Sequence, residues 1–229
     1  MTRTPPHIWS GERACLSHSQ ASTALKTGSR EMLTAPACGP TRAVPQEKSA
    51  RAFLNTLDLE LRSDALQTTE GLRAWVAAWL PNVAGAAFTD DDRRRAVSLR
   101  EALRSVAAAN SPSTAGAAAV VRLNDEAENL PLILRFSTSG VRLGAAPGTR
   151  HPLGAAILGI VAVATINGSW ERLKICPAPD CLWAFYDHSK NRMGVWCQMG
   201  ECGNRHKVRR HRERRRSQAT VKASSPLRQ

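Results

Sequence analysis

Two pairs of cysteines near the C-terminal end constrain the fold of this chain more than any other feature. Four residues separate Cys176 from Cys181, and Cys197 and Cys202 repeat this spacing after an interval of fifteen residues. Zinc prefers four tetrahedral thiolates, which proteins commonly supply as two short loops that each offer a pair. The two prolines of "CPAPDC" stiffen the first loop. The spacing therefore predicts one structural Zn²⁺ ion bound by Cys176, Cys181, Cys197 and Cys202.

Other uses of four cysteines fit this pattern less well. Two disulfides are disfavoured because no secretory signal is visible, and cytosolic proteins rarely keep disulfides. Iron–sulfur clusters usually need tighter spacings, and a catalytic zinc needs an open position that four thiolates would fill. His188 or His206 could replace a cysteine, although we expect both to lie nearby without binding the metal. Cys15 and Cys38 have no partner at ligand spacing, and we expect them to be free thiols.

The residues around the pairs predict a small zinc module. The segments "LWAFY" and "GVW" have the composition of strands, and "DHSKNRM" would join them. A loop, a hairpin and a second pair at the start of a helix form a treble-clef-like layout. With so few apolar residues, such a module is marginal without a metal.

A strongly basic segment, "GNRHKVRRHRERRR", follows Cys202 directly. Gly203 can take a positive φ at a sharp exit, and Asn204 is a suitable N-cap. Val208 is the only apolar residue between Arg205 and Arg216, so the helix has no face for a core. Like charges at i,i+4 weaken such a helix in isolation, and we expect an anion to order it.

Nucleic acid is the expected anion, because the major groove of B-DNA accepts a helix and guanine offers bidentate sites to arginine. At 100° per residue the cations form two stripes on roughly opposite sides. One stripe would face bases and the other a phosphate backbone. The predicted contacts are Arg205, Lys207, Arg209, Arg210, Arg212, Arg214, Arg215 and Arg216.

The charge distribution supports a polyanion-binding end. The net charge of the chain is +13. Residues 171–229 hold 14 Lys/Arg against 5 Asp/Glu, a net of +9, whereas the first 170 residues hold 18 against 14, a net of +4. This asymmetry favours DNA as the partner, with RNA or a ribosome as the alternative. A solvated, solubilising tail is the remaining interpretation.

Hydrophobic periodicity predicts a mainly α domain upstream, over residues 49–168. Helical patterns occur in three segments, "ARAFLNTLDLELRS", "TTEGLRAWVAAWLPN" and "TDDDRRRAVSLREALRSVAAAN". In the second segment, Thr68 or Thr69 can cap the start of the helix and Pro81 can end it. Trp75 and Trp79 are expected in the core rather than in a ligand pocket. A fourth helix is predicted over residues 115–129.

The period changes in "PLILRFSTSGVRLG", which predicts a short β-hairpin. The apolar run from Leu153 to Ile166 is too short to cross a bilayer, so we expect a buried helix. No Ser/His/Asp grouping, phosphate-cradling glycine loop or HExxH motif is visible, so we predict neither an enzyme nor catalytic residues. A cytoplasmic protein without a membrane partner is the expectation.

The rest of the chain divides into three further segments. We expect residues 1–48 to be a disordered leader, or an extension from an upstream start codon, because they show no sustained period. Residues 169–216 would form the zinc module with its basic helix. Residues 217–229 would be a disordered tail.

The window from Cys176 to Arg216 resembles the CGNR zinc finger, a family named for the tetrapeptide that stands here at Cys202 to Arg205. "CPAPDC", Trp196-Cys197 and the basic tail share the resemblance, which covers about 40 residues. Upstream, "FLNTLDLELRSDALQTTEGLRAWV" is similar to the opening of the ABATE domain that usually precedes this finger, a looser match over about 120 residues. Leu182 departs from the family pattern, which commonly has glycine after the second cysteine. The hairpin tip is less basic than usual, and the 48-residue leader has no known counterpart.

The resemblance implies a stress-linked bacterial transcription regulator with zinc bound by the four cysteines. It also implies that the basic tail contacts DNA. We therefore expect a zinc-dependent DNA-binding regulator whose N-terminal domain senses a small-molecule effector or forms a homodimer. The alternative is an RNA- or ribosome-binding zinc protein.

Overall fold

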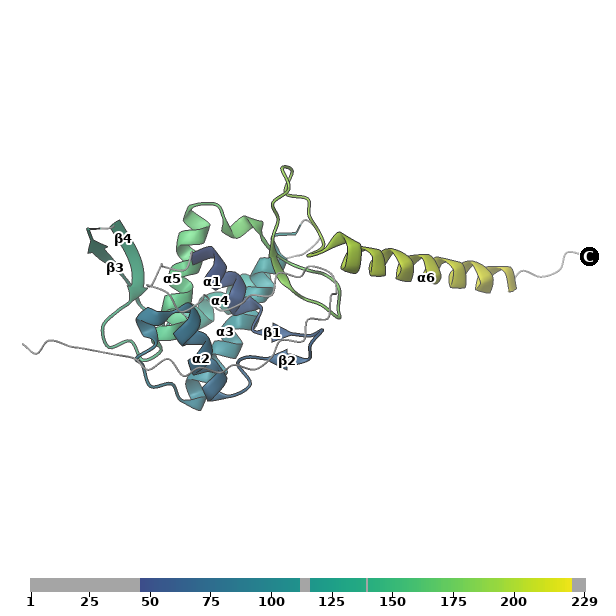
Figure 1. Ribbon diagram of the computed structural model, residues 1–229. Helices are drawn as coiled ribbons and strands as arrows, with labels where there is room; N and C mark the ends of the chain where they lie inside the picture. The colour runs from purple at the N-terminus through teal and green to yellow at the C-terminus, as the bar shows by residue number, and fades with distance from the viewer. Residues whose placement is uncertain (1–45, 112–115, 139, 224–229) are drawn as a thin grey trace, which may run out of the picture. The chain divides into compact units, whose positions relative to one another are not determined.

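The computed structural model describes residues 46–111, 116–138 and 140–223, which form six α-helices and three two-stranded antiparallel sheets (Figure 1). The helices are α1 (Gln46–Leu54), α2 (Thr69–Trp79), α3 (Asp90–Ala108), α4 (Ala117–Ala127), α5 (Pro152–Ile166) and α6 (Asn204–Ala223). The strand pairs are β1 (Leu57–Asp58) with β2 (Ser63–Asp64), β3 (Leu132–Ser137) with β4 (Gly140–Ala145), and β5 (Leu173–Ile175) with β6 (Ala184–Tyr186). This is the mainly α fold that the sequence predicts.

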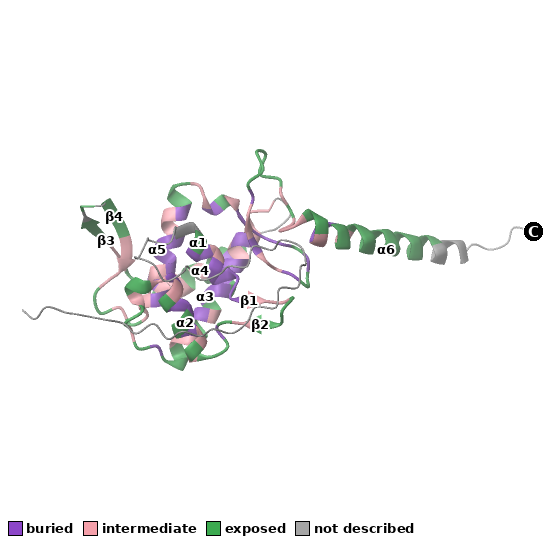
Figure 2. Cartoon of the chain, in the orientation of Figure 1, coloured by how far each residue is buried: buried purple, intermediate pink, exposed green. Residues whose placement is uncertain are grey.

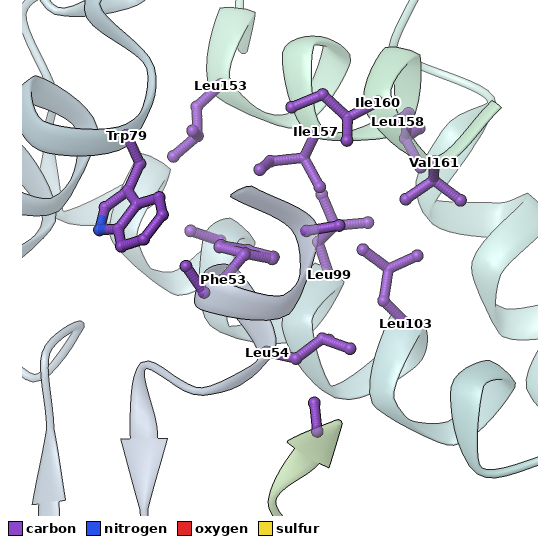
Figure 3. Packing of buried hydrophobic residues seen from close by; sticks show 14 of the residues in the cluster. Phe53, Leu54, Trp79, Leu99, Leu103, Leu153, Ile157, Leu158, Ile160 and Val161 are labelled. Carbon is purple, nitrogen blue, oxygen red and sulfur yellow. The ribbon is translucent and has the colours of Figure 1, made fainter. Parts of the chain in front are cut away.

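Helices α1, α3 and α5 contact one another around one hydrophobic core. Phe53 of α1 lies at its centre with 0% exposure, and Leu103 of α3 is 1% exposed (Figure 3). Most of α5 is apolar, so it is buried along most of its length, as predicted. Trp75 and Trp79 are also buried in this core, with the Trp75 ring 5.3 Å from the ring of Phe53. The tryptophans are therefore packing residues.

Local capping explains where α2 and α3 begin. The Thr68 hydroxyl accepts a hydrogen bond of 3.1 Å from the amide of Gly71 at the start of α2. At α3, Thr89 and Asp92 form a capping box in which each side chain accepts from the other residue's backbone amide. These contacts confirm the two predicted helix starts. The Pro81 stop is confirmed too, because α2 gives way there to a 3₁₀ turn, Pro81–Val83.

The first predicted helix is wrong beyond Leu54. The chain instead forms the short β1–β2 hairpin, and Leu61 is 70% exposed rather than facing the core. The Asp58 carboxylate accepts hydrogen bonds from the amides of Glu60 and Leu61, at 2.9 and 3.0 Å, and so favours a turn over a helix. The spacing of apolar residues alone did not reveal that a turn at Asp58 competes with the helix.

The later predictions agree better with the structure. The β3–β4 hairpin is confirmed, and α4 lies within the predicted range 115–129. The boundaries at the two ends differ from expectation, because α1 already begins at Gln46 and α6 continues to Ala223. Residues 1–45, which include Cys15 and Cys38, lie outside the described residues. Within the described part, no helix is both long and apolar enough to cross a membrane.

The core can be tested with one buried and one exposed leucine. Leu103→Ala leaves a cavity, so we expect it to lower the free energy of unfolding by about 2–5 kcal/mol. Leu61→Ala changes an exposed side chain, so we expect a change within about 0.5 kcal/mol. Urea unfolding followed by tryptophan fluorescence measures both. Equal losses in the two variants would contradict this core.

Candidate metal centre

The first cysteine pair lies in the turn of the β5–β6 hairpin. Leu173 pairs with Tyr186 and Ile175 with Ala184, and the segment between these strands carries Cys176. The Cys176 amide donates to the Trp183 carbonyl at 2.9 Å, which closes the loop. The expected pairing of "LWAFY" with "GVW" is therefore wrong, because the strand partner of β6 lies before the first cysteine.

A buried ion pair explains why the segment "GVW" is held as part of a loop rather than as a strand. The Lys174 ammonium lies 2.8 Å from an Asp187 carboxylate oxygen, and both side chains are almost fully buried. Lys174 also donates to the carbonyls of Arg192 and Gly194, and the Gly194 amide donates to Asp187 at 2.7 Å. The loop before the second cysteine pair is thus tied to β5 through side chains rather than through a strand ladder.

The charge state of this pair follows from its contacts. Burial raises the pKa of Asp187, but the hydrogen bonds from Lys174, Ser189 and Gly194 outweigh it and hold the pKa well below its usual range. The carboxylate therefore stays ionised at neutral pH. Sequence reasoning missed both residues, although a lysine between the buried Leu173 and Ile175 was a usable signal.

The second pair leads into the basic helix without a break. A π-helical turn, Met199–Gly203, carries Cys202, and α6 starts at the next residue. Gly203 is needed for space rather than for a positive φ, since a Cβ there would lie 2.4 Å from Met199 Sδ and 3.2 Å from Trp196 Cδ1. Asn204 is already helical and donates to the Gly200 carbonyl at 2.9 Å. The predicted N-cap role is wrong, because the preceding turn supplies the backbone partners.

The four cysteine sulfurs form a cluster of the size that one metal ion needs. All four lie within 4.8 Å of one another. Cys197 Sγ is 3.6 Å from Cys181 Sγ and 3.7 Å from Cys202 Sγ. Zn–S bonds of about 2.3 Å place the corners of a tetrahedron about 3.8 Å apart, whereas a disulfide needs about 2.0 Å. The spacing fits a Zn²⁺ tetrathiolate and not a pair of disulfides.

Crowding affects the thiols as expected for a cation site. Hydrogen bonding with Cys176 and Cys181, together with burial, raises the pKa of Cys197. Burial and the neighbouring Cys176 and Cys181 raise the pKa of Cys202 to about 11. Hydrogen bonds with Cys176 and Cys197 lower the pKa of Cys181 to about 2, so the cluster favours one thiolate and disfavours ionisation of its neighbours. A divalent metal would bind them with release of protons, so we expect affinity for the metal to fall as the pH is lowered.

Neither candidate histidine belongs to the cluster. Among the described residues, the four cysteines are the one group of potential ligands at metal-binding distance. His206 instead places its ring 4.8 Å from the ring of Trp196, and His188 is exposed. The predicted set of four cysteines is the set that the fold brings together.

Arg205 differs from the other predicted nucleic-acid contacts. Its guanidinium donates to Cys202 Sγ at 3.2 Å, and it lies 3.6 Å from the Asp180 carboxylate and 3.8 Å from that of Glu60. The arginine therefore faces the sulfur cluster and two acids. Its position indicates a role in neutralising the metal site.

The other basic residues of α6 lie on an exposed helix. Every residue from Lys207 to Gln218 is exposed (Figure 2). Glu213 is the one acid in this helix, and its carboxylate lies 4.0 Å from Arg209 Nε. The structure thus joins a buried sulfur cluster directly to a cationic helix.

Metal analysis tests the cluster. We expect one zinc per chain after purification under reducing conditions, and Cys197→Ser to lose most of it because a tetrahedral corner is removed. The double variant Cys15→Ser/Cys38→Ser is the matched control and should keep the full zinc content. Elemental analysis of both variants measures this. Retention of stoichiometric zinc by Cys197→Ser would contradict the assignment.

Comparison with known families agrees with this arrangement. Residues 172–215 match the model of the CGNR zinc finger. Residues 47–168, more than half of the chain, match the model of the ABATE domain, described as "Putative stress-induced transcription regulator". A comparison with curated proteins found no match. The chain therefore belongs to the ABATE family, and it carries a CGNR zinc finger after the ABATE domain.

Proposed function

We propose that this protein is a zinc-dependent, DNA-binding transcription regulator. The observation that carries the proposal is that α6 starts two residues after Cys202, the last cysteine of the cluster, and buries none of its residues from Lys207 to Gln218. A helix without a buried face gains no stability from a core, so we propose an external polyanion as its stabilising partner. The family description as a transcription regulator supports DNA as that partner.

The size and charge of α6 suit the major groove. Its 20 residues correspond to about 30 Å at 1.5 Å per residue. The helix holds nine Lys/Arg and one Glu, a net charge of +8. B-DNA admits a helix in its major groove, with a phosphate backbone on each side. Cations on opposite sides of the helix would therefore meet bases and phosphates together.

We narrow the proposed contact set in one respect. Because Arg205 faces the sulfur cluster, we assign the DNA contacts to the seven remaining residues. These are Lys207, Arg209, Arg210, Arg212, Arg214, Arg215 and Arg216. The zinc site would set the direction in which this surface leaves the finger, and the ion would supply structural charge rather than reactivity.

The helical domain has two proposed roles, sensing and dimerisation. A cavity of about 60 Å³, lined by residues that include Asp92, Glu126 and His151, has room for a few waters or a ligand of similar size. One face of the β3–β4 hairpin exposes Phe136, at 78%, beside Leu134 and Val141. The cavity supports a small effector, and the apolar hairpin face supports contact with a second copy.

Binding to random-sequence duplex DNA tests the proposal. If about six cations meet phosphates, log K should fall with log salt at a slope of about −5. Arg209→Ala/Arg212→Ala should weaken binding at least tenfold and reduce the slope to about −4, because two phosphate contacts are lost. Fluorescence anisotropy at several salt concentrations measures both quantities.

The control removes two exposed arginines from another surface. Arg135 and Arg142 face each other across the β3–β4 hairpin, and Arg135→Ala/Arg142→Ala changes the net charge by the same amount. We expect this variant to bind as the wild type does. Equal effects of the two double variants would reject α6 as the contact surface. Tighter binding to RNA than to duplex DNA would favour the RNA-binding alternative.

A further inference from the structure

Two segments of the ABATE domain hold the backbone that follows the first cysteine pair. Asn55, directly after α1, uses both ends of its side-chain amide. It donates to the Ala184 carbonyl at 2.9 Å and accepts from the Ala184 amide at 2.7 Å. Asn55 and Ala184 are both buried. The side chain therefore takes the place of a strand partner for β6, three residues after the ligand Cys181.

Arg104 of α3 makes a second connection. One nitrogen of its guanidinium donates to the Leu54 carbonyl at 2.6 Å, and another donates to the Leu182 carbonyl at 2.7 Å. Leu182 follows Cys181 directly and has a left-handed backbone with φ of 49°. A single buried side chain thus bridges the end of α1 and the residue after a zinc ligand.

The charge of Arg104 is poorly balanced within the ABATE domain. The residue is 6% exposed, and Glu101, whose side chain is half exposed, lies 3.5 Å from its Nε. Arg100, on the preceding turn of α3, adds repulsion. Burial is the main cause that lowers the pKa of Arg104, while Glu101, Asp64 and Cys181 act in the opposite direction. A buried cation needs a nearby anion.

The zinc site supplies such an anion. A Zn²⁺ ion with four thiolates carries a net charge of about −2. Arg205 reaches this charge from the side of α6, through Cys202. Arg104 approaches it from the side of α3, where it donates to the carbonyl of Leu182, the residue after Cys181. One guanidinium from the finger and one from the ABATE domain would therefore neutralise the complex.

The apolar packing is continuous across the same boundary. Leu173, Ile175 and Ala184 of the finger belong to the core cluster that contains Phe53 and Leu103. Asn110, just after α3, donates to the carbonyls of Trp170 and Leu173, each at 2.8 Å. The finger is thus packed on the ABATE domain.

We propose that Arg104 is a positioning residue that couples zinc binding to the fold of the ABATE domain. Zinc binding would fix the Leu182 carbonyl and, through Arg104, the ends of α1 and α3. If zinc binding stabilises one position of α3, thermodynamic linkage requires that a change in the ABATE domain that shifts α3 out of that position weaken zinc binding by the same coupling free energy. A signal received by this domain would reach α6 through the metal site. The coupling itself concerns metal binding, so it stands whether or not α6 binds DNA.

Arg104→Met tests the coupling, and Arg100→Met is its matched control. Arg100 lies one turn away on α3 and is equally buried, but its partners, Asp64, Thr56 and Glu101, all belong to the ABATE domain. Competition with a chromogenic zinc chelator, without nucleic acid, measures the affinity. We expect Arg104→Met to weaken zinc binding at least tenfold, Arg104→Lys to weaken it less, and Arg100→Met to leave it within twofold of the wild type.

Thermal unfolding of the same proteins with and without zinc shows whether a variant is merely unstable. Both methionine variants should have a lower Tm, but only Arg104→Met should reduce the gain in Tm that zinc provides. Wild-type zinc affinity in Arg104→Met, or an equal loss of affinity in Arg100→Met, would overturn the proposal.

Hydrogen exchange in the wild-type protein gives a test without substitutions. Removal of zinc with a chelator should speed amide exchange in α3 and at the end of α1 as well as around the cysteines. An effect confined to residues 172–203 would overturn the proposal even if every variant failed to fold.

Discussion

The convergence of four sulfurs is the constraint on which the C-terminal part of the molecule depends. Two of them lie in a hairpin turn, and the other two lie in and just before the π-helical turn that leads into α6; neither segment has a large core of its own. The cysteine cluster is packed against Trp183, Phe185 and Trp196, which are only partly buried. A metal at this point does what an extended hydrophobic core does elsewhere, because it holds segments that apolar contact alone would leave loose.

Patterns within short segments of the sequence predicted much of the fold, but contacts between distant residues could not be predicted from it. Thr68 and Thr89 mark helix starts through contacts within three residues, and the cysteine spacing is equally local. The partner of β6 could not be predicted in this way, because it depends on Lys174 meeting Asp187 and on Asn55 meeting a residue 129 positions away. Such pairs have no periodic pattern. They are recognised only after the chain has folded.

The basic segment shows why residue type alone does not assign a role. Arg205 and Arg209 are one helical turn apart and looked equivalent in the sequence. Both are exposed, but the first lies beside a sulfur and two carboxylates, whereas the second lies near His206 and Glu213. Only the first contacts a sulfur of the cysteine cluster. The arginine of the CGNR tetrapeptide thus lies against the cluster, and the arginines beyond it lie on the exposed surface of α6.

The amide of Asn55 has a further consequence for the small sheet. A two-stranded sheet has two open edges, and an open edge can recruit a strand from another molecule. At Ala184 the backbone groups that point away from β5 are already occupied by the Asn55 side chain. A strand from another molecule could therefore pair with β6 at Ala184 only by displacing the Asn55 side chain.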